Sequence, residues 1–326
     1  MTLEYQYFYA PLVSICLGAS ILLTLLRFPH FLVDHPNQRS LHDKPVPRTG
    51  GIAIASGILV STGLFLPQFA VFTISALLIA ILSLADDWRQ LKPLTRFGTQ
   101  GLIVVAFCVF GLDRLTIANY VFLVLAIVWV ANLYNFMDGS DGLAGGMAVI
   151  GFSACALGAY IGDSIPLAIL CSLIATATLP FLALNFHPAR VFMGDVGAVT
   201  LGFSAAAIGA IGWREGIWSP FFPVFVFSPF IADSSLTLLH RILRKEKFWR
   251  PHREHYYQKL IQMGLGHRNT ALLEYAVMLA SSVFGIASFY IDGEKQLVAI
   301  VVWGSVLMLF ASRIDRKWSA FNEVPQ

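Results

Sequence analysis

Eleven apolar stretches run along the 326-residue chain and are separated by short polar segments. They are continuously apolar and do not alternate as strands do, which favours membrane-spanning helices over a β-barrel. At about 20 residues per crossing, the chain has room for eleven spans with short loops and for no long soluble domain. The predicted spans are 8–28, 50–66, 69–85, 98–112, 118–136, 143–161, 165–184, 196–213, 217–241, 271–291 and 296–312.

The composition agrees with a membrane protein. The chain is 57% hydrophobic and 13% charged, whereas soluble proteins contain about 45–50% apolar and 25% charged residues. These values exclude disorder, a collagen-like fibre, a disulfide scaffold and an ordinary soluble enzyme. The four cysteines lie inside apolar stretches and are expected to be reduced. We therefore expect an all-α polytopic membrane helix bundle with a single domain over residues 1–326.

Lysine and arginine residues lie almost entirely on one side of this bundle. If loop 27–49 lies on one side, the same side holds four more loops and the C-terminal tail, with nineteen of the 22 Lys and Arg residues. The positive-inside rule makes this side cytoplasmic, with the N-terminus periplasmic and the C-terminus cytoplasmic. The five cytoplasmic loops between spans are 27–49, 86–97, 137–142, 185–195 and 242–270.

The first two of these loops combine cations with acids. Lys44 and Arg48 precede a glycine pair that begins a span, and free backbone N–H groups at a helix start suit a phosphate. The alternative is a plain basic loop with helix-breaking prolines. Asp86 and Asp87 end the third span, where the helix dipole disfavours anions. A bound cation, a proton or a salt bridge to Arg89 would offset that cost.

The third loop follows a polar end of the fifth span. Asn132, Asn135 and Asp138 recur every third residue and are predicted to form one ridge. Polar groups at membrane depth are costly and usually face the bundle interior or an aqueous cavity. Asp141 follows them, and it either joins this site or caps the sixth span.

The fourth loop contains Asn185, Phe192 and Asp195 among prolines and glycines. Asp195 precedes the eighth span, so it is either an N-cap or a ligand of a hard cation. Phe192 is either a packing residue or a platform on which a nucleobase stacks.

The fifth loop carries two arginines and two histidines. Such side chains suit phosphate oxygens, although a basic stretch beside the membrane also attracts anionic head groups. A zinc site has little support because no cysteine or third histidine lies close by. Upstream, Asp233 is expected to pair with His240, Arg241 or a neighbouring helix. The loop residues concerned are Arg250, His252, Arg253 and His255.

Carboxylates and cations at one membrane surface suit a divalent ion and a polyphosphate substrate. Magnesium is usually held by one or two carboxylates together with substrate phosphate oxygens. The membrane setting indicates a lipid as the second substrate.

Five stretches carry a family resemblance, and they are HDKPVPRTGG, LADDW, NLYNFMDGSDGLAGG, NFHPARVFMGDVG and PHREHYY. These stretches resemble the motifs of the polyprenyl-phosphate N-acetylhexosamine-1-phosphate transferases, glycosyltransferase family 4. They occur in the same order and on the same side of the membrane as in that family, and they span residues 42–257. The resemblance implies transfer of an N-acetylhexosamine 1-phosphate from a UDP-sugar to undecaprenyl phosphate with release of UMP. It also implies a bacterial inner-membrane location with the site facing the cytoplasm.

Departures from the family pattern point to a branch. Tyr256 and Tyr257 follow His255, where the peptidoglycan branch has three successive histidines and the common-antigen branch has His-x-His-His. Ala198 stands where many members have serine. The pattern is most similar to the branch that initiates lipopolysaccharide O-antigen synthesis, and it argues against a muramoyl-pentapeptide substrate. The hexosamine stays open between GlcNAc, FucNAc and QuiNAc.

The resemblance implies a role for each motif residue. Asp195 would hold Mg²⁺, for which Mn²⁺ can substitute, on the diphosphate, and Asp86 would orient or deprotonate the lipid phosphate and also touch the metal. Phe192 would lie against the uracil. The implied catalytic set is Asp86, Asp87, His252 and His255, and the implied metal ligands are Asp195 and Asp86. The implied substrate-binding set is Lys44, Arg48, Asn132, Asn135, Asp138, Asp141, Asn185, Phe192, Arg250 and Arg253.

Two rival interpretations remain at this point. A secondary transporter of an anionic solute would place ionisable groups near the membrane midplane, often on inverted repeats. Here the acids cluster at one face and no repeat is visible, which favours the transferase. The second rival is a noncatalytic scaffold that binds anionic lipids, and only the basic loops support it. No nucleic-acid partner is expected, and a homodimer is left open.

Overall fold

Each predicted span forms one helix in the computed structural model of the chain. The structure describes residues 2–28, 31–34, 36, 45–113, 115–247 and 252–323, with side chains from residue 9 onward. Within these residues nine helices are long and apolar enough to cross a membrane, and two shorter apolar ones are Tyr9–Leu25 and Gly50–Phe65. A polytopic helix bundle is therefore confirmed. The long helices are α1 (Thr2–Leu25), α2 (Gly50–Phe65), α3 (Ala70–Arg89), α4 (Pro93–Gly111), α5 (Ile117–Phe136), α6 (Leu143–Ile161), α7 (Ile165–Asn185), α8 (Gly194–Arg214), α9 (Phe221–Leu243), α11 (Gly266–Ala287) and α12 (Gly293–Glu323).

Some helices extend beyond the predicted apolar stretches. The pattern of apolar residues ends at the membrane surface, whereas helical hydrogen bonds continue through polar residues beyond it. Thus α3 includes Asp86 and Asp87, and α12 continues to Glu323. The predicted loop 242–270 is also partly helical. The remaining short elements are the strands β1 (Val33–Asp34) and β2 (Val46–Pro47), the helix α10 (Tyr256–Leu260), the π turn Ile261–Leu265, and the 3₁₀ turns Pro67–Phe69 and Ser288–Tyr290.

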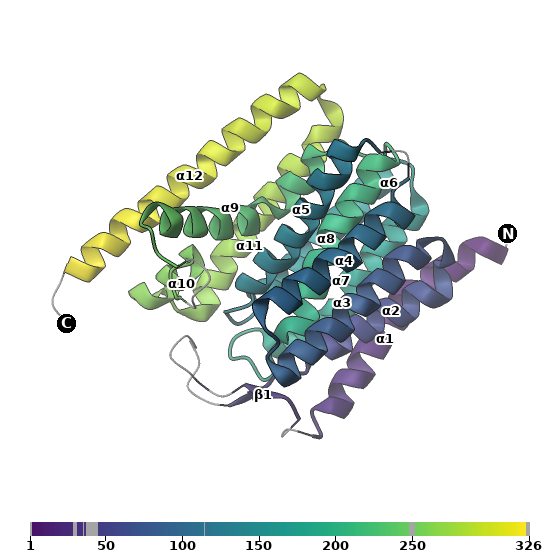
Figure 1. The fold of residues 1–326 in the computed structure, drawn as a ribbon, viewed down its shortest axis with the longest axis horizontal. Coiled ribbons are helices and arrows are strands. Elements are labelled where there is room, and N and C mark those ends of the chain that lie inside the picture. Colours follow the sequence, from purple (N-terminus) through teal and green to yellow (C-terminus); the bar gives the residue numbers. More distant parts are fainter. Residues whose placement is uncertain are drawn as a thin grey trace.

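Helix α8 forms the centre of the bundle, where α2, α3 and α5 pack against it (Figure 1). Of its apolar window, 89% is buried, the highest share among the spans found in the described chain. Small residues make this possible, since glycine and alanine recur along α8 and let neighbouring backbones approach closely. The N-terminal end of α8 is thereby fixed against the ends of three other helices.

The two chain termini lie at opposite ends of the bundle (Figure 1). This arrangement agrees with an odd number of crossings. At the end opposite the expected cytoplasmic side, Arg214 forms an ion pair with Asp113, so two of the loops assigned to that side lie together. The assignment of one end to the cytoplasm stays a prediction.

The glycine pair at the start of α2 packs against the start of α8. The N–H groups of Gly50 and Gly51 donate to the carbonyl oxygens of Phe192 (3.0 Å) and Met193 (2.8 Å). A Cβ on Gly51 would lie 2.2 Å from the backbone nitrogen of Gly197. The expectation that these N–H groups are free to bind a phosphate is therefore wrong. The pair instead lets two helix ends meet.

We expect the substitution Gly51→Ala to destabilise the protein because a methyl group at this contact must push α2 and α8 apart. Overpacking of this kind costs about 1–3 kcal/mol. Gly63→Ala, in the same helix, is the matched control, since a Cβ there meets nothing within 4 Å. Thermal unfolding in detergent should give a lower melting temperature for Gly51→Ala alone. Equal melting temperatures for the two variants would contradict the contact.

Candidate active site

Two carboxylates cap the N-terminus of α8. The carboxylate of Asp87 accepts hydrogen bonds from the backbone N–H groups of Asp195 and Val196, the latter at 3.4 Å. Asp138, just after α5, accepts from the N–H of Gly194. The positive end of the α8 dipole thus offsets the cost of placing an acid at the end of α3. The proposed N-cap role of Asp195 is wrong, because Asp195 lies in the first turn of α8 without a cap bond.

Two arginines join these acids. Nη2 of Arg48 lies 2.9 Å from Oδ1 of Asp87 and 3.4 Å from Oδ1 of Asp195. Nη1 of Arg96, in α4, lies 3.0 Å from Oδ2 of Asp86 and 3.8 Å from Oδ2 of Asp195. The salt bridge that the sequence suggested for the Asp86–Asp87 pair is therefore made by Arg48 and Arg96, from α2's N-terminal side and from α4.

Asp86 also closes the turn between α3 and α4. Its Oδ1 accepts from the backbone N–H of Leu91 at 2.8 Å. Its carboxylate therefore has one oxygen bound to the backbone and one bound to Arg96, and Asp86 is buried. Asn135 completes the group, since its side chain donates to Asp195.

We call Asp86, Asp87, Asp138 and Asp195 the carboxylate cluster, and among the described residues it faces two guanidinium groups. Burial lowers the pKa of Arg48, but nearby Asp87 and Asp195 outweigh this effect and raise it. Burial raises the pKa of Asp138 well above its usual range; Arg48 opposes this shift, and Asp195 adds to it. Four acids beside two fixed cations leave negative charge that protons or a further cation must balance.

The donor set fits a divalent cation only if a substrate completes the coordination. Within the described chain, no group of three or more His, Cys, Asp or Glu side chains is arranged to hold a metal ion alone. Magnesium, however, usually takes one or two carboxylates and fills its other positions with water and phosphate oxygens. Asp195 lies between Arg48 and Arg96, which are suited to those phosphates.

A second group of polar side chains adjoins the start of α6. Oδ2 of Asp141 lies 2.7 Å from Nδ1 of His187 and accepts from the N–H of Ala189 at 3.1 Å. Asn185 accepts from the N–H of Gly142 at 2.9 Å and donates to the carbonyl of Val191 at 2.9 Å. The N-cap of α6 is Gly142, so the capping role considered for Asp141 is wrong. These contacts hold the third and fourth loops together.

Asn132 and Phe192 lie differently from the other predicted residues. The Asn132 amide donates to Oε1 of Gln100 at 2.8 Å and to the carbonyl of Val128 at 2.7 Å. It therefore joins α5 to α4, and the expected ridge through Asn135 and Asp138 lacks this member. The Phe192 N–H donates to the carbonyl of Pro47 at 2.8 Å, which places its backbone beside the β2 strand, and its side chain is half-buried.

The predicted histidines lie in the histidine segment, residues 252–257, which leads into α10. The rings of His252 and His255 are 5.0 Å apart, although the two residues precede the helix and do not share a helical face. Burial lowers the pKa of His252 to about 4, with His255 and Arg241 acting in the same direction. These surroundings favour the neutral form of His252.

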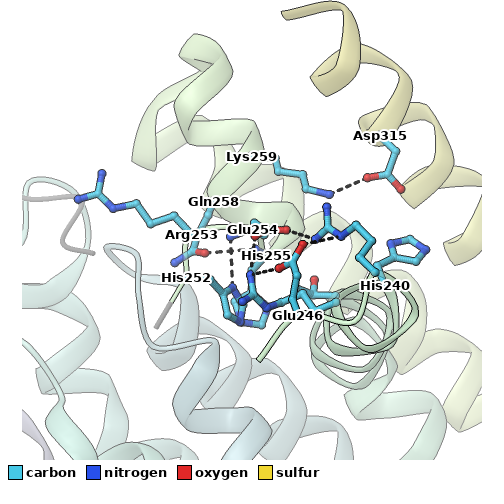
Figure 2. A network of polar contacts seen from close by, with 12 residues as sticks. His240, Glu246, His252, Arg253, Glu254, His255, Gln258, Lys259 and Asp315 are labelled. Carbon is cyan, nitrogen blue, oxygen red and sulfur yellow. Dashed lines mark hydrogen bonds and ion pairs between the residues drawn. The ribbon is translucent and has the colours of Figure 1, made fainter. Parts of the chain in front are cut away.

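Ion pairs anchor the histidine segment to α9 and α12 (Figure 2). Glu254 binds Arg241 at 2.5 Å and also Arg244. Burial raises the pKa of Glu254, but Arg244 and Arg241 outweigh it, so that pKa is lowered. On the other side, the Tyr256 hydroxyl donates to Oδ2 of Asp315 in α12 at 2.9 Å, and Nζ of Lys259, two residues beyond the segment, lies 2.6 Å from Oδ1 of Asp315. The segment is thus held from two directions.

The histidine segment also contacts the end of α5. The Phe136 ring stacks on His255 with centroids 6.1 Å apart, and the Tyr257 hydroxyl donates to the Phe136 carbonyl at 3.1 Å. Phe136 follows Asn135, which binds Asp195. A continuous series of contacts therefore joins the histidines to the carboxylate cluster.

Several residues at this site were not predicted from the sequence. Arg96 could have been found as a cation ten residues after Asp86, whereas His267 carries no local signal. His267 stacks on His187 with centroids 5.5 Å apart. The predicted residues Lys44 and Arg250 lie outside the described residues. Arg253 lies in the histidine segment, and its side chain extends away from Asp315 (Figure 2).

Known proteins are similar to most of this chain. A profile of glycosyl transferase family 4 matches residues 69–212. A probable undecaprenyl-phosphate N-acetylglucosaminyl 1-phosphate transferase of Bacillus subtilis is 31% identical over 85% of this chain and 80% of its own length. The undecaprenyl-phosphate alpha-N-acetylglucosaminyl 1-phosphate transferase of Escherichia coli K12 is 27% identical over 88% and 84%. A decaprenyl-phosphate N-acetylglucosaminephosphotransferase of Mycobacterium leprae is 32% identical over 85% and 83%.

Proposed function

The chain belongs to the polyprenyl-phosphate N-acetylhexosamine-1-phosphate transferases of glycosyl transferase family 4, and we propose that it transfers N-acetylhexosamine 1-phosphate from a UDP-sugar to undecaprenyl phosphate. UMP leaves, and a lipid-linked diphosphosugar forms. One observation carries the proposal beyond family membership. Acids from α3, α8 and the end of α5 meet two arginines at one end of the bundle.

The reaction makes one phosphoanhydride and breaks another. An oxygen of the lipid phosphate attacks the β-phosphorus of the UDP-sugar, and the bond from that phosphorus to the bridging oxygen of UMP breaks. Such transfers depend on positioning and charge neutralisation more than on covalent help from the protein. Because a phosphate monoester is already largely ionised near pH 7, the lipid phosphate needs no strong base.

The two arginines are suited to the phosphates. Arg48 and Arg96 approach Asp195 from two sides at 3.4 and 3.8 Å, so a diphosphate placed beside Asp195 would be within reach of both guanidinium groups. A guanidinium presents paired N–H donors that match phosphate oxygens. As phosphates enter, each arginine can exchange a carboxylate partner for a phosphate partner. We therefore assign both arginines to neutralising the transferred group.

Asp195 and Asp86 would hold a magnesium ion. When bound, this ion supplies charge neutralisation at the diphosphate. Asp86 keeps its Leu91 hydrogen bond in the described structure, so only one of its oxygens is suited to a metal. Asp195 lies at the centre of the cluster, and we propose it as the main ligand.

The nucleotide would lie toward the third and fourth loops. Asp141 and Asn185 fix the backbone of these loops, which favours a positioning role for both beside the bound uridine. Phe192 stays the proposed stacking partner of the uracil. The site would face the cytoplasm of a bacterial inner membrane, and the product would initiate O-antigen or a related envelope polysaccharide. Because the relatives named above carry names for the transfer of a phosphorylated N-acetylglucosamine group, UDP-GlcNAc is the first donor to test.

The test is to incubate purified protein with undecaprenyl phosphate, Mg²⁺ and a panel of UDP-sugars while following UMP. We expect UMP release with a UDP-N-acetylhexosamine, dependence on the lipid phosphate, and loss of release after addition of EDTA. UDP-glucose, which lacks the N-acetyl group, is the control donor. Absence of UMP with every donor, in protein that is monodisperse in detergent, would contradict the proposal and favour the anion transporter.

A further inference from the structure

Asp233 of α9 binds the histidine segment, although it lies inside a membrane-spanning helix. Its Oδ1 accepts from the N–H of Tyr256 at 3.0 Å and lies 3.0 Å from Nδ1 of His255. Its Oδ2 accepts from the N–H of Tyr257 at 3.0 Å. The Thr237 hydroxyl donates to Oδ1 at 3.3 Å. Four donors therefore converge on one side chain that is 7% exposed.

This geometry determines which His255 nitrogen carries a proton. An ionised carboxylate has no proton to donate and can only accept hydrogen bonds, so Nδ1 of His255 donates to Asp233. In the neutral ring, the proton is then on Nδ1, and Nε2 keeps a lone pair. His255 itself is 4% exposed and is held between Phe136 and Tyr257. The ring therefore has a fixed tautomer and a fixed orientation.

Among the described carboxylates, only Asp233 bonds to His255, because the other charged groups near the Asp233–His255 pair bind one another. Arg241 and Glu254 bind each other on one side, and Lys259 binds Asp315 on another (Figure 2). Glu274 of α11 lines the same small cavity as Asp233 and Tyr256. It is buried, and no hydrogen bond or ion pair joins it to residues 255–257 in the described structure.

We propose that Asp233 is a positioning residue for the transferase reaction: it holds His255 in the tautomer that presents Nε2 to the substrate. Nε2 then accepts a hydrogen bond from a substrate hydroxyl when the ring is neutral, or donates to a phosphate oxygen when the ring is protonated. A carboxylate that orients a histidine through its other nitrogen is a general device for fixing both tautomer and direction. The proposal rests on the proposed function, because His255 acts here on the substrates of that reaction.

The first test needs no activity. The purified protein is labelled with ¹⁵N-histidine, and the His255 signals are assigned by their loss in His255→Gln. We expect the Nδ1 signal of His255 to be that of a protonated ring nitrogen, and to shift in Asp233→Asn, where an amide NH₂ replaces one acceptor. An unprotonated Nδ1 in the wild-type protein would overturn the proposal whatever the variants do. An Nδ1 signal unchanged by Asp233→Asn, in protein with a wild-type melting curve, would do the same.

The second test is kinetic. We expect Asp233→Asn to lower kcat for UMP release by roughly 30-fold, the order of loss for a carboxylate that orients a functional histidine, with the KM for the UDP-sugar within twofold. His255→Gln should cause a similar loss of kcat. The double variant should lose little more, because both changes break the same interaction between Asp233 and His255. Glu274→Gln, which removes a carboxyl from the same cavity, should keep kcat within twofold.

The outcomes separate the two proposals. If the wild-type protein releases no UMP, the proposed function fails, while the ¹⁵N spectrum still decides whether Asp233 holds His255. If the wild type is active and Asp233→Asn lowers kcat equally in the His255→Gln background, Asp233 acts independently of His255 and the positioning role is wrong. Equal losses in Asp233→Asn and Glu274→Gln would also contradict it.

Discussion

Asp195→Asn should lower UMP release by roughly 10³-fold in protein that still folds. Asp195 lies at the centre of the carboxylate cluster, within 3.4 Å of Arg48 and 3.8 Å of Arg96, and accepts from Asn135. The amide has nearly the same shape but removes the negative charge that would bind a divalent ion. Loss of one preorganised electrostatic group in an active site costs about 10²–10³ in rate, and loss of the metal adds to it.

The matched control for this substitution is Asp163→Asn. Asp163 is exposed between α6 and α7, at the end of α6 remote from the cluster. It should keep the wild-type rate, and both variants should elute as the wild-type protein does in gel filtration. A rate for Asp195→Asn within tenfold of the wild type would show that Asp195 is not a principal metal ligand.

Arg48→Gln should lower UMP release by several hundred-fold. Arg48 is the cation shared by Asp87 and Asp195, and Asp34 of β1 also lies 3.9 Å from it. Its removal leaves these acids to repel one another and takes away a donor for the transferred phosphate. A rate loss of about 10²–10³ is typical when one such donor is removed.

Two further variants separate charge from geometry at this position. Arg48→Lys keeps the charge but not the paired N–H donors, so it should recover only part of the rate. Arg89→Gln removes an exposed cation from the last turn of α3, beside Asp87 in sequence. It should leave the rate unchanged. If Arg89→Gln is as damaging as Arg48→Gln, the pairing of Arg48 with the cluster is wrong.

The helices were largely predictable because a lipid environment restricts the chain. Each span must satisfy its own backbone hydrogen bonds, so continuous apolar stretches become helices. The stretch 143–161 and the helix α6 (Leu143–Ile161) coincide for this reason. The ends were less predictable, since α12 continues to Glu323 through polar residues. There the helix packs on the side of α10, a contact with no signal in the pattern of apolar residues.

The acids of the carboxylate cluster were predictable from the sequence, but their partners were not. Paired acids such as Asp86 and Asp87 are costly at a helix end, so a compensating charge was expected. The nearest cation in sequence is Arg89, yet the structure uses Arg48 and Arg96. The distance along the chain between Arg48 and Asp195 is 147 residues. Only the packing of α2 against α8 and of α4 against α3 brings such pairs together.

Equal spacing in sequence also concealed different roles. Asn132 and Asn135 lie one turn apart on α5, but Asn132 bonds to Gln100 of α4 while Asn135 bonds to Asp195. The angle of each side chain relative to neighbouring helices decides this difference, and periodicity alone does not encode it. Asp233 was likewise expected to pair with His240, Arg241 or a neighbouring helix, and the fold instead places His255 of the histidine segment against it.

We expect acids from separate helices to hold one divalent ion together with a sugar nucleotide. Electron paramagnetic resonance of Mn²⁺ titrated into purified protein with UDP-GlcNAc tests it most directly. We predict one tightly bound Mn²⁺ per chain in the wild-type protein and in Asp163→Asn, and no tight binding in Asp195→Asn. Equally tight Mn²⁺ binding in Asp195→Asn and wild-type protein would contradict the claim.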